Sequence, residues 1–307
     1  MIIIRMTGGL GNQMFQYALY LKLKALGKDV KFDDCTEYVH ANARPIMLWS
    51  FGIDYPRATQ EEINKITDGF LYFTHRIRRK LFGRKSMEYM ENTCNFDPQI
   101  LIKEPAYLTG YFQSEKYFAD IKETVREAFT FKPVIFEGIN EHLKNKVDAY
   151  CKEIDESCSI SIHIRRGDYL DNNEVYGGNC TPAYYEAAIK RMKECFPQVV
   201  FFVFSNDDQW IAKWCTEQQT RYKVRFVPVT DTPEELGYLD MYLMSRCKHH
   251  IIANSSFSWW GAWLNKNPKK KVISPAKWFN NQDCYDIYTK EMTKISPKGI
   301  VTNDAAE

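Results

Sequence analysis

One stretch of the chain holds the residues best suited to chemistry, Ser159-Ile-Ser-Ile-His-Ile-Arg-Arg-Gly-Asp168. Isoleucines alternate there with Ser161, His163 and Arg165, which is the period-two pattern of a strand with one apolar face. The strand ends in Arg165 and Arg166, followed by a glycine and Asp168. Ligands of open α/β sheets bind at the carboxyl ends of strands, and arginine binds phosphate through two parallel hydrogen bonds. The stretch predicts a phosphate clamp or, as the alternative, a surface arginine pair bridged to Asp168.

A second candidate is a carboxylate on an apolar helix face. The spacing of Leu236, Leu239 and Leu243 predicts a helix over 233–247 with a core-facing stripe, and Asp240 falls inside that stripe. A carboxylate in such a place is costly unless something satisfies it. It could pair with an arginine or a backbone amide. It could also accept the two adjacent N–H donors of guanine, a pair that adenine lacks.

A third candidate is the serine cluster in Asn254-Ser-Ser-Phe-Ser-Trp-Trp-Gly261, where a predicted strand at 250–253 meets a predicted helix at 256–264. One serine at a helix start acts as a cap. Ser255, Ser256 and Ser258 together favour a phosphate cup, because the free N–H groups of a helix N-terminus attract anions.

The fourth candidate is the glycine loop Gly8-Gly9-Leu-Gly11-Asn12-Gln13. Glycines between a strand and a helix let the backbone approach a ligand closely. Only two glycines fit a dinucleotide-binding pattern, with Asp33 at a suitable distance to hold a ribose, so a nicotinamide-dependent enzyme is one alternative. The amides of Asn12 and Gln13 favour sugar hydroxyls instead.

Regular alternation of elements places these candidates. In the first half we expect strands at 1–6 and 30–33, a strand running into a loop over 106–115, and helices at 14–26, 61–66, 69–81, 116–129 and 139–153. From residue 159 onward, strands alternate with helices of ~10–15 residues, which indicates βαβ units and a parallel sheet. The prediction is an α/β protein of two Rossmann-like domains, residues 1–155 and 156–307, with a loose polar tail after Ser296.

Composition excludes several classes of protein. With 41 Lys and Arg against 39 Asp and Glu, the net charge is +2, so no basic field indicates a nucleic-acid partner. The nine cysteines lack metal-site spacing and indicate reduced thiols. The apolar run at the N-terminus is too short for a signal peptide, and no run approaches ~18 apolar residues. We therefore expect a cytoplasmic protein.

One basic run departs from this even charge, since Arg76 to Lys85 carries six basic residues in ten. Most such runs are solvated faces. An acceptor-binding role and peripheral contact with a membrane surface are the alternatives.

Taken together, these motifs resemble the bacterial α-1,2-fucosyltransferases of glycosyltransferase family 11. The resemblance covers most of the chain in order and is carried by Gly8-Gly-Leu-Gly-Asn-Gln-Met-Phe-Gln-Tyr17, Gly110-Tyr-Phe-Gln-Ser-Glu-Lys-Tyr-Phe118, His163-Ile-Arg-Arg-Gly-Asp168, Phe204-Ser-Asn206 and Ser255-Ser-Phe-Ser-Trp-Trp-Gly261.

The resemblance implies a GT-B-like fold, two Rossmann-like domains facing across a cleft, that uses GDP-fucose as co-substrate without an essential metal. It implies that Arg165 holds the β-phosphate, that His163 and Asp240 hold guanine, and that Ser255 and Ser256 hold phosphate. Further donor-site residues from the same motifs are Arg166, Asn206, Phe257 and Ser258. On the acceptor side, in domain 1–155, the implied cleft residues are Gly9, Gly11, Asn12 and Gln13.

The activity implied is inverting transfer of L-fucose from GDP-β-L-fucose to the 2-hydroxyl of a terminal galactose. The sequence contains no Asp-x-Asp element that would hold a metal ion. We therefore expect Arg165 to stabilise the departing diphosphate. Asp168 is expected either to brace the arginines or to act as the base, with Glu115 as an outside candidate. A non-catalytic glycan-binding protein is the other alternative.

Overall fold

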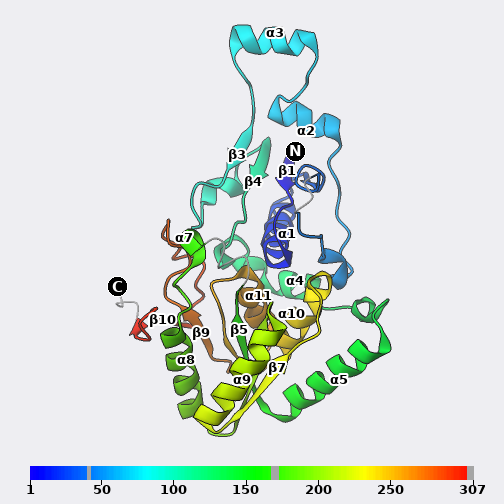
Figure 1. Cartoon of the computed structure of the whole chain (residues 1–307). Helices are drawn as coiled ribbons and strands as arrows, with labels where there is room; N and C mark the ends of the chain where they lie inside the picture. The colour runs from blue at the N-terminus through cyan, green and yellow to red at the C-terminus, as the bar shows by residue number, and fades with distance from the viewer. Residues whose placement is uncertain (40–42, 167–172, 303–307) are drawn as a thin grey trace. The chain divides into compact units, whose positions relative to one another are not determined.

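The computed structural model describes residues 1–39, 43–166 and 173–302 (Figure 1). The chain forms two compact units, Met1–Thr130 (unit 1) and Phe131–Glu307 (unit 2). The division therefore falls earlier than the expected boundary after residue 155. The physical reason is aromatic packing within unit 2, where the rings of Phe131 and Phe136 lie 5.4 and 5.9 Å from the ring of Tyr242.

Unit 1 is built on a parallel four-stranded sheet in the order β2-β1-β4-β3. Its strands are β1 (Ile2–Arg5), β2 (Val30–Asp33), β3 (Glu88–Met90) and β4 (Ala106–Thr109). Its helices are α1 (Leu10–Ala25), α2 (Gln60–Thr67), α3 (Phe73–Phe82) and α4 (Lys122–Ala128), with 3₁₀ turns at Leu48–Phe51, Pro98–Leu101, Glu115–Tyr117 and Ala119–Ile121.

Three predictions for unit 1 need correction. Helix α1 begins at Leu10 instead of residue 14, because the extended Gly9 is its N-cap and the end of the glycine loop already forms the first turn. The helix expected over 116–129 is two 3₁₀ turns followed by the short α4. Strand β3 was not predicted, because its three residues are too few to show alternation.

Unit 2 contains a seven-stranded sheet in the order β11-β10-β9-β8-β5-β6-β7, in which only β11 is antiparallel to its neighbour. The strands are β5 (Cys158–Ile164), β6 (Val199–Ser205), β7 (Arg225–Val229), β8 (His249–Ile251), β9 (Val272–Pro275), β10 (Met292–Ile295) and β11 (Val301–Thr302). The helices are α5 (Glu141–Glu156), α7 (Asn173–Tyr176), α8 (Pro182–Cys195), α9 (Asp208–Tyr222), α10 (Gly237–Arg246) and α11 (Ser256–Leu264), with 3₁₀ turns at Pro133–Phe136 and Glu234–Leu236.

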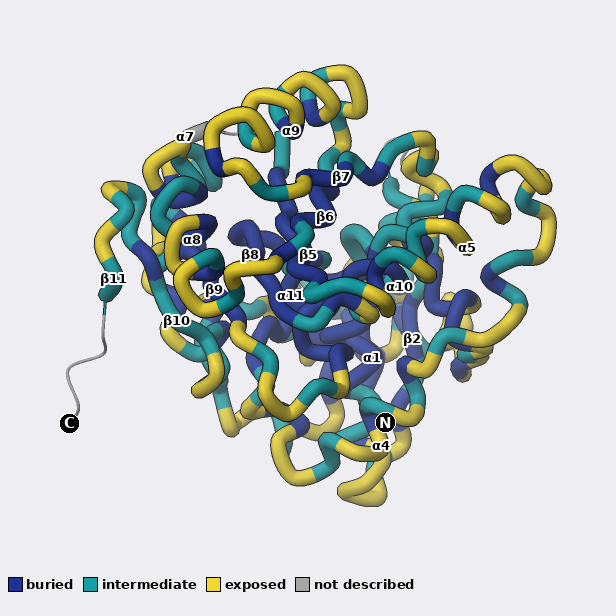
Figure 2. The backbone as a smooth tube through the Cα atoms, turned by 90° about the horizontal axis from the view of Figure 1, so that it is seen from below, coloured by how far each residue is buried: buried dark blue, intermediate teal, exposed yellow. Residues whose placement is uncertain are grey.

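Strand β5 lies in the interior of this sheet, between β8 and β6, and is buried on both faces (Figure 2). Its isoleucines pack with apolar residues of α8 and α9 on one face. On the other face Ser161 Oγ lies 2.8 Å from Nδ1 of the buried His250, whose Nε2 lies 2.7 Å from the Asn265 side-chain nitrogen. The tail is less loose than predicted, because β11 pairs with β10.

The order of the strands defines one switch point in each sheet. In unit 2 the chain runs from β5 outward through β6 to β7, then crosses to the other side of β5 and continues through β8, β9 and β10. This is the 3-2-1-4-5-6 order of doubly wound folds, in which ligands bind at the carboxyl edge where the order reverses, here between β5 and β8. In unit 1 the corresponding strands are β1 and β4.

Both units therefore confirm the predicted α/β class and the pair of Rossmann-like domains. Seven of the nine cysteines are free thiols, so the expectation of reduced cysteines holds for these seven and is wrong for Cys94 and Cys284, which are disulfide-bonded. No helix among the described residues is long and apolar enough to cross a membrane.

Candidate functional site

The carboxyl end of β5 places His163 in a dry environment at the switch point of unit 2. The imidazole lies 5.8 Å, centroid to centroid, from the ring of Phe257, and Tyr185 Oη donates a hydrogen bond of 2.9 Å to the His163 carbonyl. Burial, followed by the positive charge of Arg165, lowers the His163 pKa to about 3. The ring is therefore neutral, and its buried Nδ1 has no hydrogen-bond partner in the described part of the chain.

The two arginines after β5 have different surroundings. Arg166 is held by the loop between β6 and α9: its Nε lies 3.3 Å from the Asp207 carboxylate and its guanidinium lies 4.2 Å from the Trp210 ring centroid. Its backbone N–H donates to Asn206 Oδ1 over 3.0 Å. Arg166 and Asn206 therefore brace the edge of the site. Arg165 precedes Arg166 in the chain and is half-buried. Asp168 lies outside the described residues.

The serine cluster divides into two parts. Ser255 is the N-cap of α11, but its side chain makes no capping hydrogen bond, unlike the capping residues Thr59, Asn140 and Thr181 of other helices. The N-terminus of α11 thus has no side-chain cap from Ser255, and the phosphate-binding role of Ser255 and Ser256 stays a prediction. Ser258 is buried and its hydroxyl hydrogen-bonds to the backbone of Ala253 and Ser255. Its placement among donor-binding groups is therefore wrong.

Asp240 is another residue of unit 2 with an unsatisfied polar atom. Because α10 begins at Gly237 instead of residue 233, Asp240 lies in the first helical turn, where the helix dipole favours a negative charge. Its Oδ1 is shielded from solvent and has no hydrogen-bond partner among the described residues. Burial raises the Asp240 pKa to about 7, and the charge of Asp208 adds to this against a lowering hydrogen bond from Thr232.

The equivalent edge of unit 1 is built very differently. Gln13 and Gln16 are fully buried. Gln13 Nε2 donates to the carbonyls of Gly8 (2.8 Å) and Pro45 (2.9 Å), and its Oε1 accepts from Met47 N (3.0 Å). Gln16 links the two central strands, accepting from Thr7 N (3.2 Å) and donating to the Gly110 carbonyl (2.9 Å). Gln13 therefore holds the loop in place and was wrongly expected to face a sugar.

Asn12 is partly exposed and accepts a hydrogen bond of 2.8 Å from Gln113 Nε2. The left-handed Gly8 (φ +76°) brings the loop so close to Asn12 that an added Cβ would lie 2.5 Å from its Nδ2. Gly9 caps α1, and Gly11 is buried in its first turn. Of the four predicted cleft residues, Asn12 thus keeps a side chain that a ligand could reach.

Sequence reasoning missed Glu91, which no motif marked. Its carboxylate accepts the backbone N–H groups of Tyr111 (2.7 Å) and Phe112 (3.1 Å), and so holds Phe112 at φ +53°. Burial raises the Glu91 pKa to about 7 against the lowering effect of these hydrogen bonds. The only sequence signal was Gly110, where an added Cβ would lie 2.5 Å from Glu91 Cβ.

Asp33, the predicted ribose ligand of a nicotinamide enzyme, is satisfied within unit 1. Its carboxylate accepts from Cys35 N, Thr36 N, Thr36 Oγ1 and Tyr107 Oη over 2.5 to 3.0 Å. Burial alone would raise its pKa, but these bonds outweigh burial and lower it. Asp33 therefore has no capacity left for a ribose, and the nicotinamide alternative loses its key residue.

The described residues contain no group of three or more His, Cys, Asp or Glu side chains arranged to hold a metal ion. What unit 2 offers instead is a doubly wound sheet whose switch point carries an arginine pair, the buried His163 and a helix N-terminus that Ser255 does not cap, with Asp240 in the helix that follows β7. These features are those of an α/β protein with a candidate site for a small anionic ligand.

Comparison with known proteins gives the family. The family described as "Glycosyl transferase family 11" matches residues 1–296, so the chain belongs to glycosyltransferase family 11. The predicted resemblance is thereby confirmed. Among its relatives, an Escherichia coli alpha-1,2-colitosyltransferase is 36% identical over 301 residues, covering 92% of this chain and 93% of the relative. The Escherichia coli O-antigen biosynthesis glycosyltransferase WbnK is 33% identical over 295 residues, covering 89% and 93%.

A more distant relative is the mouse galactoside 2-alpha-L-fucosyltransferase Sec1, 23% identical over 271 residues, which cover 86% of this chain and 64% of the mouse protein. Solved structures with some likeness include POFUT1 in complex with GDP, with 12% identity, a TM-score of 0.47 and coverage of 90% of this chain and 98% of that chain. The alpha-1,6-fucosyltransferase NodZ co-crystallised with GDP has 14% identity, a TM-score of 0.45 and coverage of 85% and 91%.

Proposed function

We propose that this glycosyltransferase transfers L-fucose from GDP-β-L-fucose to the 2-hydroxyl of a terminal β-galactoside, with inversion at the anomeric carbon. The observation that carries the proposal is the pair of buried polar atoms without partners, His163 Nδ1 and Asp240 Oδ1, in the unit that carries the arginine pair. Buried polar atoms are usually paired. The described part of unit 2 has further exceptions, among them the hydroxyls of Ser157, Ser205 and Ser274, but His163 and Asp240 are the imidazole and the carboxylate among them, and these are groups that can recognise a base. The names of the α-1,2-linking relatives support the sugar and the linkage.

Guanine is the base that fits Asp240. Its N1–H and exocyclic amine present two adjacent donors, and a carboxylate can accept both. The neutral His163 ring supplies a further polar contact, and the apolar ring of Phe257 beside it provides a surface against which a base can pack. Binding guanine would satisfy Asp240, which offsets the cost of holding a carboxylate in a dry place.

The diphosphate is assigned to Arg165 and the N-terminus of α11. In the reaction the bond between the fucose anomeric carbon and the phosphate oxygen breaks, and a bond to the galactose 2-oxygen forms, with loss of the hydroxyl proton. Negative charge grows on the leaving GDP, and preorganised donors stabilise it. The sequence has no Asp-x-Asp element, so we propose that Arg165 and the helix N-terminus supply this stabilisation without a metal ion.

No base is assigned to the incoming hydroxyl. Glu115, the outside candidate, is paired with Lys122 at 2.9 Å. Asp168 keeps its two predicted roles, as a brace for the arginines or as the base.

The test is a GDP-release assay over a panel of galactosides, followed by determination of the product linkage. We expect release only with acceptors that have a free 2-hydroxyl on a terminal galactose, and no loss of activity with EDTA. Thermal stabilisation by GDP but not by ADP would support the guanine site. Release that is indifferent to the galactose 2-hydroxyl, or stabilisation by both nucleotides, would contradict the proposal.

A second candidate donor is GDP-activated colitose, favoured by the 36% identity to a colitosyltransferase. Colitose differs from fucose by the absence of the 3-hydroxyl, so the two donors make the same demands on the guanine and diphosphate sites. Competition between the two GDP-sugars in one assay decides between them through the ratio of their kcat/KM values.

A further inference from the structure

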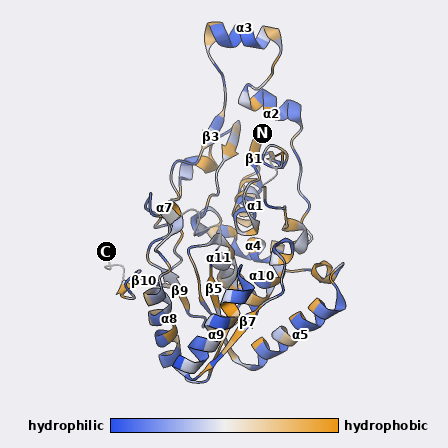
Figure 3. Ribbon diagram, viewed as in Figure 1, coloured by the Kyte–Doolittle hydropathy of each residue, from blue (hydrophilic) through white to orange (hydrophobic). Residues whose placement is uncertain are grey.

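Residues 70–87 form a basic arm of unit 1 that includes α3 (Figure 1). The arm carries six Lys and Arg residues and neither Asp nor Glu, although the whole chain is almost neutral. None of the ten residues of α3 is buried. Figure 3 shows hydrophobic residues beside strongly hydrophilic ones along this helix. The segment therefore combines a purely positive charge with an exposed helix.

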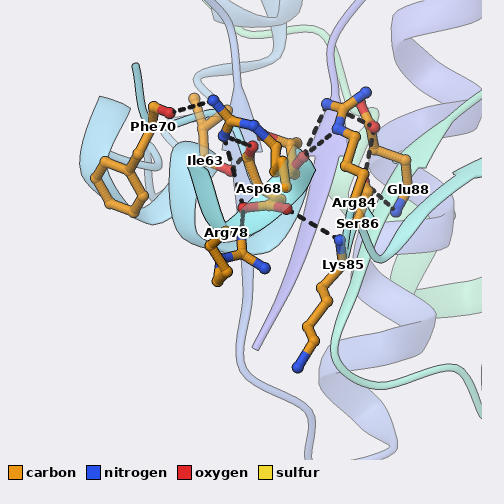
Figure 4. A network of polar contacts seen from close by, with 10 residues as sticks. Ile63, Asp68, Phe70, Arg78, Arg84, Lys85, Ser86 and Glu88 are labelled. Atoms are coloured by element: carbon orange, nitrogen blue, oxygen red, sulfur yellow. Dashed lines mark hydrogen bonds and ion pairs between the residues drawn. The ribbon is translucent and has the colours of Figure 1, made fainter. Parts of the chain in front are cut away.

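The inner face of the arm is fastened to the end of α2 (Figure 4). The Asp68 carboxylate pairs with Arg78 and accepts the backbone N–H of Lys85 over 2.9 Å. Arg79 donates to the carbonyls of Asp68 (2.7 Å) and Phe70 (2.8 Å). The Lys85 side chain points away from this network. These contacts fix which face of α3 is turned toward the rest of unit 1.

The outer face of α3 is apolar. At 3.6 residues per turn, Phe73, Ile77 and Leu81 form a stripe opposite Arg79. Their exposed fractions are 75%, 43% and 67%. Leu71, Tyr72 and Phe82, next to or at the ends of the helix, are also exposed.

Two cations border the apolar stripe. Arg76 and Lys80 follow Phe73 and Ile77 by three residues each, which places them on one flank of the stripe. Both are exposed, and neither makes an ion pair with another residue that the structure describes. The outward side of the arm therefore presents apolar side chains bordered by positive charge.

We propose that the arm binds the surface of an anionic phospholipid bilayer, with α3 lying in the plane of the interface. A short helix with an apolar stripe and basic flanks is the form that peripheral membrane helices take. The outward groups are apolar side chains and cations. The surface of an anionic bilayer can contact both kinds of group without a specific arrangement of its own groups. A protein groove would have to match them one by one. The proposal goes beyond the transferase activity and does not depend on the identity of the donor or acceptor.

The experiment is cosedimentation of the full chain with vesicles of phosphatidylglycerol and phosphatidylcholine, compared with phosphatidylcholine alone. We expect binding to the anionic vesicles only, weakened by salt. Each Lys or Arg near such a surface contributes roughly fivefold in affinity, so Arg76→Glu with Lys80→Glu should weaken binding by at least about 25-fold. The control, Lys24→Glu with Lys65→Glu, makes the same charge change on exposed residues of unit 1 outside the arm.

The apolar stripe is tested by Phe73→Ser with Leu81→Ser, against Ile102→Ser on another exposed site of unit 1. The stripe variant should bind anionic vesicles more weakly, and the control should not. Circular dichroism shows that each variant is folded. Binding to neutral vesicles, equal losses in the control variants, or no binding at all would overturn the proposal. So would a dimer of the parent chain that Phe73→Ser with Leu81→Ser dissociates. GDP binding by the same variants reports separately on the transferase site.

Discussion

The two parallel sheets carry polar residues at the same topological position, but they use them in opposite ways. At the switch point of unit 1, Gln13 and Gln16 are buried and every amide hydrogen bond goes to the backbone of neighbouring loops. At the switch point of unit 2, His163 Nδ1 is buried without a partner, and the N-cap serine of α11 makes no capping bond. The glutamines of the first edge are satisfied by the chain itself, whereas the histidine of the second is a candidate for contact with a ligand.

This difference explains why motif residues in the two halves carry different meaning. The glycine–Asn–Gln motif of unit 1 is mostly structural, because its glutamine and the later Gln16 hold loops that glycines have brought close together. The His-x-Arg-Arg motif of unit 2 is the better candidate for a functional role, because the buried His163 Nδ1 has no hydrogen-bond partner in the described part of the chain. The comparison predicts that variants at the first edge change stability, whereas variants at the second change binding and turnover.

The largest effect is expected for Arg165→Ala. Loss of one preorganised donor to the leaving diphosphate should lower kcat by about 10²–10³, or ~3–4 kcal/mol of barrier. Arg166→Ala should cost less, because the Arg166 guanidinium is already engaged by Asp207 and Trp210. Steady-state kinetics on both variants provide the measurement. Near-normal turnover of Arg165→Ala would remove the diphosphate assignment.

At the edge completed by the chain, Gln16→Ala should reduce stability without weakening GDP binding. The substitution leaves Thr7 N and the Gly110 carbonyl without their partner, which costs about 2–4 kcal/mol in all. Urea unfolding measures this loss, and the exposed Gln99→Ala is the matched control. Gln16→Ala could instead keep full stability while its activity no longer saturates with acceptor. The amide would then bind the acceptor, and the contrast between the two edges would fail.

The sequence was sufficient for the α/β class and for most strands of unit 2, while the roles of His163, Arg165 and Asp240 stay predictions. It failed where a residue's role depends on what lies opposite. Nothing in the sequence pattern distinguishes Gln13, whose amide is hydrogen-bonded to the backbone, from the partly exposed Asn12. The same holds for Ser258 and Ser255, since each pair shares a chemical type and a motif. Glu91 lies outside every motif, because its partners are backbone N–H groups some twenty residues away.

For Asp240→Asn we expect a smaller loss, in GDP affinity. A hydrogen bond to a charged group contributes about 1.5–3 kcal/mol, so binding should weaken about 10- to 100-fold. Inosine diphosphate lacks the exocyclic amine of guanine, and the substitution should therefore reduce the difference between GDP and inosine diphosphate. Titration calorimetry with both nucleotides gives this comparison, with the exposed Glu235→Gln as control. An unchanged preference for GDP in Asp240→Asn would place guanine recognition elsewhere.

The smallest effect is a pH dependence of GDP binding that belongs to Asp240. Its pKa is raised to about 7, so the carboxyl of the free protein is half protonated near neutral pH, while guanine requires the carboxylate. Affinity should therefore rise with pH up to about 7 and level off above it, falling about tenfold per pH unit well below that point. His163, with a pKa of about 3, stays neutral throughout and adds nothing to this slope. Titration of nucleotide groups contributes equally in Asp240→Asn, so the difference between the two curves isolates the carboxyl. Parallel curves for the parent chain and Asp240→Asn would mean that guanine binding is not coupled to deprotonation of Asp240. The unsatisfied oxygen of Asp240 would then not bind guanine.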